Sequence, residues 1–130
     1  MRIDPKSHVP VFRQIVEGLQ SAIAAGIYRS GEVLPSVRVL AIELQVNPNT
    51  VQRAYEELER QGVIEARRGV GKFVARNGPR SALGQAEVAV RDAFDRGVEL
   101  AFDADLSKTR IRELFNGVLS QQSDASRTQP

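Results

Sequence analysis

The sequence predicts a mostly α-helical fold with a small β-hairpin, organised as a winged helix-turn-helix followed by a two-helix C-terminal region. Three features lead to this prediction. Three amphipathic segments with helix-capping residues come first, and a tight turn separates the second from the third. A glycine-cornered pair of short β-type segments follows, and two further amphipathic stripes occupy the C-terminal part.

The first predicted helix runs from about Pro10 to Ala25. Proline suits the first helical turn, because the N–H group that it lacks has no partner there. Gly26 ends the helix. Apolar residues recur at spacings of three and four, which predicts one buried stripe: Phe12, Ile15, Val16, Leu19, Ala22 and Ile23.

The next two helices form the predicted helix-turn-helix pair. After an extended entry over residues 31–35, Ser36 is the predicted N-cap of a helix over residues 36–44. Asn47 caps the third helix and Gly62 ends it. The predicted buried faces of the pair consist of Val37, Leu40, Ala41 and Leu44, and of Val51, Ala54, Tyr55 and Leu58.

A short β-hairpin follows the third helix. Two strands are predicted over residues 63–66 and 72–75, joined by Arg67-Arg68-Gly69-Val70-Gly71, in which the glycines suit positive φ angles. The surrounding sequence is basic, since residues 60–76 contain a single acidic residue, Glu65, against Arg60, Arg67, Arg68, Lys72 and Arg76. Such a cluster is typical of a phosphate-binding surface, although charge alone leaves open a solvated charged hairpin.

Asn77-Gly78-Pro79 is a turn-forming sequence, and we place the domain boundary there. The prediction is a winged helix-turn-helix domain over residues 1–78, a two-helix region over residues 79–120 and a disordered tail over residues 121–130. Ser107 is the expected N-cap of the second of these helices.

The two C-terminal helices are predicted to form a dimerisation surface. Two helices cannot by themselves enclose a ligand pocket of roughly 300–1,000 Å³. They can bury their apolar stripes against a second copy of the chain, and the residues expected in that interface are Phe94, Val98, Leu114, Phe115 and Val118. The alternative is that the helices fold back onto their own N-terminal domain.

Several side chains of the predicted helix-turn-helix suit DNA. Asn and Gln pair bidentately with adenine, and Arg pairs with guanine or phosphate, so polar residues at the start of the third helix are candidate readers. A winged helix-turn-helix inserts this helix into the major groove, while the preceding helix and the hairpin contact the backbone. The candidate DNA-binding residues are Ser36, Arg38, Asn47, Asn49, Thr50, Gln52, Arg53, Arg67, Arg68, Gly69 and Lys72.

Each of these residues also has a simpler interpretation. Asn47 and Asn49 suit helix caps, and Gln52 and Arg53 suit an ordinary solvated surface. Arg38 has possible ion-pair partners in Glu43 and Glu56. The glycines of the hairpin serve turn geometry in either case.

Residues 10–76 resemble the N-terminal domain of GntR-family bacterial transcription regulators. The resemblance implies a dimeric repressor that binds a double-stranded operator. By position, Arg38 matches the family's arginine in the first helix of the pair, Asn49 and Gln52 match its readers, and Gly69 matches its wing-tip glycine. Lys72 stands where many members have Ser or Thr. The pattern is present as Gly31-x-x-Leu34-Pro35-Ser36-x-Arg38-x-Leu40-Ala41, Asn47-x-Asn49-Thr50-Val51-x-Arg53-Ala54-Tyr55-x-x-Leu58-Glu59, Gly62 and Gly69-x-Gly71-x-Phe73-Val74.

The short C-terminal region resembles the YtrA subfamily, in which a helical tail is a dimerisation module. This resemblance implies a homodimer through the C-terminal helices, and members of the subfamily often regulate transporter operons. It leaves open whether a small-molecule effector exists and whether the regulator represses or activates.

Composition argues against several other classes of protein. The chain has no cysteine, one histidine and no apolar run long enough to span a membrane, which favours a cytoplasmic protein without a metal or other cofactor. No catalytic set of residues is recognisable, so an enzyme is not expected. The remaining alternatives are a winged-helix module for protein interaction and a non-specific architectural DNA-binding protein.

Overall fold

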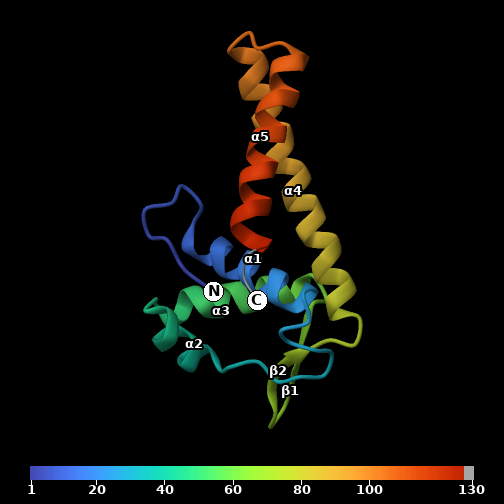
Figure 1. Ribbon diagram of the computed structural model, residues 1–130. Helices are drawn as coiled ribbons and strands as arrows, with labels where there is room; N and C mark the ends of the chain where they lie inside the picture. The colour runs from blue at the N-terminus through green and yellow to red at the C-terminus, as the bar shows by residue number, and fades with distance from the viewer. Residues whose placement is uncertain (128–130) are drawn as a thin grey trace. The chain divides into compact units, whose positions relative to one another are not determined.

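The computed structural model describes residues 1–127 of the chain (Figure 1). The protein is mostly helical with one two-stranded antiparallel sheet, as the sequence predicts. The elements are α1 (Val11–Ala24), α2 (Val37–Leu44), α3 (Pro48–Arg60), β1 (Ile64–Arg67), β2 (Gly71–Val74), α4 (Gly78–Asp103) and α5 (Lys108–Arg127). They form two compact units that divide between Val88 and Ala89, called here the N-terminal and C-terminal units.

The predicted starts of α2 and α3 are confirmed, and their caps explain them. The Ser36 hydroxyl accepts a hydrogen bond of 3.1 Å from the Val39 backbone N–H at the start of α2. The Asn47 side chain accepts one of 2.8 Å from the Asn49 N–H at the start of α3. Each bond satisfies one of the backbone donors that a helix start leaves without a partner. Gly62 has a φ angle of 76°, which stops α3 in the left-handed region that glycine tolerates best.

The core of the N-terminal unit lies where α1 and α2 pack against α3, with the first strand beside them. The apolar side chains of this core recur along the helices at the spacings of three and four that the sequence predicts. Val37 and Leu44, expected on the buried face of α2, are only partly buried. The largest fully buried side chains are Tyr55, Ile15, Leu19, Ile23, Leu58, Ile64, Val16, Val51, Val63 and Val74.

The two strands of the hairpin each lie one residue closer to its tip than predicted. Ile64 pairs with Val74 and Arg67 pairs with Gly71, so only three residues form the connecting turn. Gly69 and Gly71 have φ angles of 82° and 102°, and Gly71 is therefore able to close the ladder instead of lying in the loop. The predicted connection over residues 67–71 was longer than the one observed.

The extended segment before α2 lies beside β2 and forms backbone hydrogen bonds with it. The Leu34 N–H donates to the Lys72 carbonyl over 2.8 Å, and the Val74 N–H donates to the Glu32 carbonyl over 2.9 Å. These bonds attach the entry of the helix-turn-helix pair to the wing. The orientation of α2 is thus linked to that of the hairpin.

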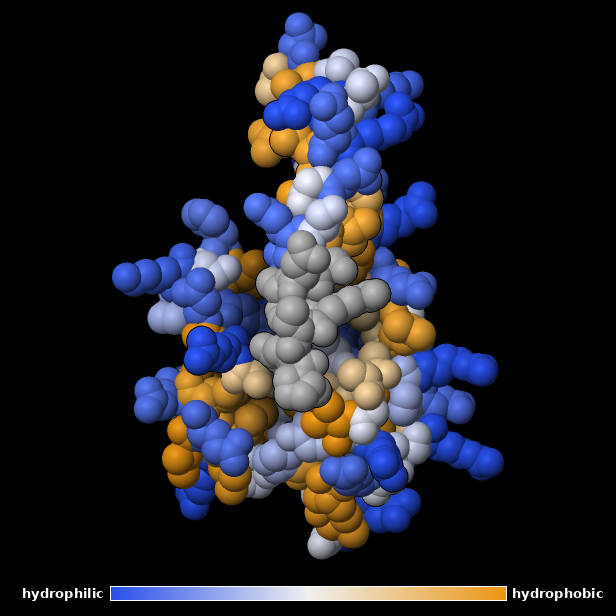
Figure 2. All heavy atoms as spheres, in the orientation of Figure 1, coloured by the Kyte–Doolittle hydropathy of each residue, from blue (hydrophilic) through white to orange (hydrophobic). Residues whose placement is uncertain are grey.

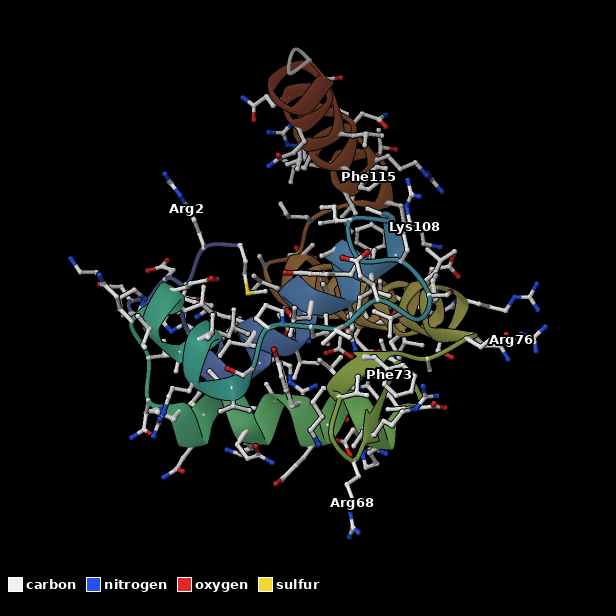
Figure 3. The ribbon with its side chains drawn as sticks, turned by 90° about the horizontal axis from the view of Figure 1, so that it is seen from below. Arg2, Arg68, Phe73, Arg76, Lys108 and Phe115 are labelled. Carbon is white, nitrogen blue, oxygen red and sulfur yellow. The ribbon has the colours of Figure 1, made fainter. Side chains whose placement is uncertain are left out.

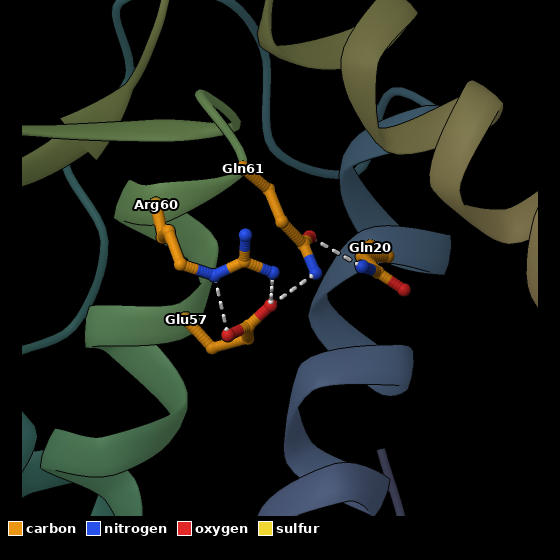
Figure 4. Close-up of polar contacts among 4 residues, drawn as sticks. All are labelled: Gln20, Glu57, Arg60 and Gln61. Carbon is orange, nitrogen blue, oxygen red and sulfur yellow. Dashed lines mark hydrogen bonds and ion pairs between the residues drawn. The ribbon is translucent and has the colours of Figure 1, made fainter.

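A chain of polar contacts joins α1 to the end of α3 (Figure 4). Buried Gln20 donates to the Gln61 side-chain oxygen over 2.6 Å, and Gln61 donates to Glu57 over 2.9 Å. Arg60 donates to the same carboxylate and lowers the pKa of Glu57, mainly through this hydrogen bond. The contacts satisfy a polar side chain that is otherwise enclosed by the core.

The predicted boundary at residues 77–79 lies instead at the start of a helix. Proline is tolerated in a first helical turn, so Pro79 does not interrupt α4. A Cβ atom at Gly78 would lie 2.5 Å from the Val63 carbonyl oxygen, which means that glycine permits a close approach to the hairpin. Ala82, one turn later, is fully buried. The first turns of α4 therefore belong to the N-terminal unit, and the two units divide after Val88.

The C-terminal unit contains the rest of α4 and all of α5. The Ser107 hydroxyl accepts a hydrogen bond of 3.1 Å from the Arg110 N–H, which confirms the predicted cap. Residues 121–127, part of the tail predicted to be disordered, continue α5. They include no proline or glycine that would interrupt a helix, even without an apolar anchor. Residues 128–130 of the predicted tail lie outside the described residues.

No helix within residues 1–127 is long and apolar enough to cross a membrane.

Candidate nucleic-acid interface

The polar face of α3 is the centre of the candidate interface. Val51, Ala54 and Tyr55 are completely buried, so the helix has one fixed inner face. Asn49 and Arg53 are therefore exposed, and Gln52 is half-buried. Amide and guanidinium groups on the free side of a helix are the groups that read base edges in a major groove.

The Tyr55 hydroxyl fixes α3 to the segment that leads into α2. It donates a hydrogen bond of 2.7 Å to the Pro35 carbonyl oxygen. Burial raises the pKa of this hydroxyl well above its usual value, so the group remains protonated and able to donate. Because Pro35 directly precedes the cap of α2, this bond sets the spacing between the two helices of the pair.

Some of the predicted DNA-binding side chains already have partners within the protein. Ser36 and Asn47 act as helix caps, as the simpler interpretation expects. The Gln52 amide donates to Glu56 over 3.2 Å. The Arg53 guanidinium carbon lies 3.8 Å from the centroid of the Phe12 ring in α1. A reading role for Gln52 therefore requires its amide to exchange Glu56 for a base.

Arg38 lies on the exposed side of α2. The ion pairs considered from the sequence, with Glu43 or with Glu56, are absent from the part of the chain that the structure describes. Its guanidinium group is thus available to solvent, which suits contact with a phosphate.

The wing presents fewer free charges than its sequence suggests. Arg68 points outward from the tip of the hairpin, whereas Arg76 projects in another direction (Figure 3). The Arg67 guanidinium carbon lies 4.6 Å from the centroid of the Phe73 ring on the other strand. Lys72 forms an ion pair with Glu59 of α3, and Arg60 forms one with Glu57. The basic segment is therefore not one patch, and Arg67 and Arg68 are its cations at the wing tip.

Sequence reasoning missed two partners that shape this interface. Glu59 holds the wing lysine against α3, and Phe12 holds Arg53. Glu59 is 13 residues from Lys72, so helical spacing does not connect them. Phe12 was assigned to the buried stripe of α1, but it is only partly buried. Phe12 is the first residue of the apolar stripe of α1, and an aromatic residue at the end of a stripe was the one sign that its ring could be exposed to an arginine.

A second surface lies on the C-terminal unit. Apolar residues reach the surface along α4 and α5 (Figure 2). The Phe94 and Phe115 rings meet edge to face with their centroids 5.6 Å apart, yet these side chains are 53% and 45% exposed. The other residues expected at a dimer interface, Val98, Leu114 and Val118, are also exposed. Contiguous apolar surface of this kind is typical of a site that a protein partner covers.

In comparison with known proteins, one family model matches both the helix-turn-helix and the wing. The model of the family described as bacterial regulatory proteins, gntR family, matches residues 12–74, from α1 to the end of β2. The HTH-type transcriptional repressor YtrA of Bacillus subtilis (strain 168) is 39% identical over 124 residues, which is 95% of this chain and 93% of the repressor. The similarity thus includes the C-terminal helices.

Solved structures share this fold. A GntR family transcriptional regulator from Listeria monocytogenes has a TM-score of 0.74 at 30% identity, over 88% of this chain and 98% of that one. The DNA-binding domain of AraR, solved in complex with operator ORX1, has a TM-score of 0.52 at 26% identity, over 58% of this chain and 99% of that one. The match to AraR therefore concerns a domain of this fold that binds DNA.

Proposed function

This chain belongs to the GntR family of bacterial regulatory proteins and is a DNA-binding transcription regulator, not an enzyme; we propose that it is a homodimeric repressor of a palindromic operator. The observation that supports this proposal most strongly is that one unit has a polar, exposed face on α3 and the other unit has an apolar, exposed face. The first suits DNA and the second suits a copy of the same chain.

The proposed roles on DNA divide between base reading and backbone contact. Asn49, Thr50 and Gln52 read base edges from the first two turns of α3, where Asn49 is exposed and the other two side chains are half-buried. Arg38 of α2 and Arg68 at the wing tip contact phosphates, which positions the protein without reading sequence. Gly69 lets the wing backbone approach the DNA closely, because it has no side chain.

The proposed dimer forms through α4 and α5. Phe94, Phe115 and their apolar neighbours become buried between two copies, which removes their exposed surface from water. A two-fold axis through this interface places two α3 helices on half-sites about one helical turn of DNA apart. Dimerisation and a palindromic operator are thus two consequences of one symmetry.

The direction and target of regulation are proposed from similarity. The relative that matches along almost the whole chain is a repressor, which favours repression here. A transporter operon in the bacterial cytoplasm is the proposed setting, and the presence of an effector is left open.

Selection of bound sequences from a random duplex pool tests the proposed function, at about 150 mM salt to suppress non-specific binding. We expect a palindromic motif. An unenriched pool would contradict sequence-specific regulation and favour the architectural or protein-interaction alternative.

Two substitutions then separate reading from positioning. On the selected operator, Gln52→Ala is expected to relax discrimination at one base pair by about 1–3 kcal/mol, whereas Arg38→Ala weakens binding to all sequences alike. Equal losses on operator and random DNA for Gln52→Ala would contradict its role as a reader.

A further inference from the structure

Two arginine side chains gather on one aromatic ring beside α3. The guanidinium carbon of Arg53 lies 3.8 Å from the centroid of the Phe12 ring, and that of Arg13 lies 5.1 Å from the same centroid. Arg13 and Phe12 belong to α1, whereas Arg53 belongs to α3. The ring attracts both cations through its π face, so it brings together two like charges that would otherwise repel each other.

Neither arginine forms an ion pair with a carboxylate in the part of the chain that the structure describes. Within residues 1–127, the ion pairs are Arg60–Glu57, Lys72–Glu59 and Arg110–Glu113. Glu57 is already bonded to Arg60 and Gln61, and Glu56 accepts from Gln52. Arg13 and Arg53 are both exposed, and neither forms an ion pair in this part of the chain, although Arg13 is close enough to Glu57 to contribute to the lowering of its pKa.

The position of the pair connects it to the reading face. One surface hollow is lined by residues from the starts of α1 and α3, and Arg53 forms part of its wall with Phe12, Asn49 and Thr50. A neighbouring hollow is lined by Phe12, Arg13 and Arg53 together with Glu56, Glu57 and Arg60 of α3. The two arginines therefore stand at the edge of the surface from which Asn49 is expected to read bases.

We propose that Arg13 and Arg53, held on the Phe12 ring, form a clamp for a DNA-backbone phosphate next to the half-site that Asn49 and Gln52 read. This inference rests on the proposed function and deepens it. Arg53 then contacts the backbone instead of a base, Arg13 becomes a DNA-binding residue that the sequence did not indicate, and Phe12 becomes a positioning residue.

The chemistry of the stack favours a phosphate over a base edge. A guanidinium group stacked on a ring keeps its N–H donors free around its rim, where they match the oxygens of a phosphate in a bidentate arrangement. To reach a base, Arg53 would have to extend away from Phe12 and lose the stacking. A backbone phosphate beside the groove needs no such movement.

The salt dependence of DNA binding tests the clamp. Each phosphate contact adds about 0.9 to the slope of log affinity against log salt concentration. We expect Arg13→Gln and Arg53→Gln each to lower the slope, the two together by about that amount per protomer, and each to weaken operator and random duplex by the same factor. Arg96→Gln, an exposed arginine of the C-terminal unit, is the matched control and is expected to leave the slope unchanged.

The role of the ring is tested by Phe12→Leu and Phe12→Tyr. Phe12→Leu is expected to lower the slope as the combined Arg13→Gln and Arg53→Gln variant does, to add no further loss to that variant, and to retain a cooperative thermal unfolding transition. Phe12→Tyr keeps a π face and is expected to bind as the wild type does. A Phe12→Leu variant that unfolds would leave the two arginine variants, which change exposed side chains only, to decide the matter.

Failure of the clamp is distinguishable from failure of the proposed function. Unchanged slopes for Arg13→Gln and Arg53→Gln would overturn the clamp even if the wild type selects an operator. If Arg53→Gln weakened binding to the operator but not to random duplex, Arg53 would be a base-reading residue and the clamp would be overturned. If the wild type shows no operator preference, the proposed function fails, and the slopes on random duplex still test the clamp. Inorganic phosphate that stabilises the wild type but not Arg13→Gln, with unchanged DNA slopes, would instead assign the site to a small anion and overturn the inference.

Discussion

The two units of this molecule use similar amphipathic patterns with opposite results. In the N-terminal unit, Ile15, Leu19 and Leu58 are at most 1% exposed, because three helices and a hairpin close around them. In the C-terminal unit, Phe94 is 53% and Val118 is 57% exposed, because two helices bury only the contact between them. An apolar stripe therefore predicts that a face is to be covered, but the number of neighbouring elements decides whether the same chain covers it.

The difference also separates what each unit contributes to stability. The N-terminal unit has a contiguous core, so its folding depends on its own packing. The apolar faces of the C-terminal unit gain their full burial only when a partner is present, which makes that gain dependent on protein concentration. Both tyrosines, Tyr28 and Tyr55, lie in the N-terminal unit and the chain has no tryptophan, so tyrosine fluorescence reports on that unit alone.

The largest effect is expected from Leu58→Ala in the core of α3. Leu58 is fully buried, so its truncation leaves a cavity and lowers the free energy of unfolding by about 2–5 kcal/mol. Urea unfolding followed by tyrosine fluorescence measures the loss, which should be the same at low and high protein concentration. A loss that shrinks as concentration rises would mean that the N-terminal unit also depends on a partner.

The next effect is expected from Phe94→Ala in the C-terminal unit. If Phe94 anchors the dimer, its truncation costs about 2 kcal/mol or more of association free energy. The dimer then dissociates at roughly 30-fold higher concentration. Sedimentation equilibrium measures this change, with Arg96→Gln on the same helix as the control. Equal association of Phe94→Ala and wild type would remove this face from the interface.

A smaller effect is expected from Tyr55→Phe. The substitution removes the hydrogen bond to the Pro35 carbonyl but keeps the buried ring, so the N-terminal unit loses about 1 kcal/mol. Tyr28→Phe is the matched control, because Tyr28 is only partly buried and donates no hydrogen bond among those found in residues 1–127. Urea unfolding measures both variants. Equal losses of unfolding free energy in the two variants would show that the hydrogen bond of the Tyr55 hydroxyl does not stabilise the N-terminal unit.

The helix-turn-helix was predictable from local chemistry. Ser36 and Asn47 cap helices through contacts with residues two or three positions away, and such contacts depend on the sequence nearby. The exposed side of α3 followed from the spacing of its buried residues. The hairpin turn is shorter than predicted, because the positive φ of Gly71 is compatible with either the turn or the ladder.

Contacts between distant segments were not predictable. Spacing along the chain does not connect Lys72 to Glu59 or Phe12 to Arg53, because each pair meets only when separate elements pack. The same limit applied to Gly78, which reads as a boundary in sequence but permits close packing of α4 on the hairpin. The roles of Asn49 and Gln52 on DNA stay predictions.

The most direct test of the account is the mass of the protein–DNA complex on the selected operator, measured by native mass spectrometry for the wild type and for Phe94→Ala. The account predicts two chains on each duplex for the wild type, and loss of the two-chain complex for Phe94→Ala at a concentration where the wild type retains it. A wild type that occupies the operator as a single chain, or a variant that pairs as well as the wild type, would contradict the claim that the exposed face of the C-terminal unit joins two DNA-reading units.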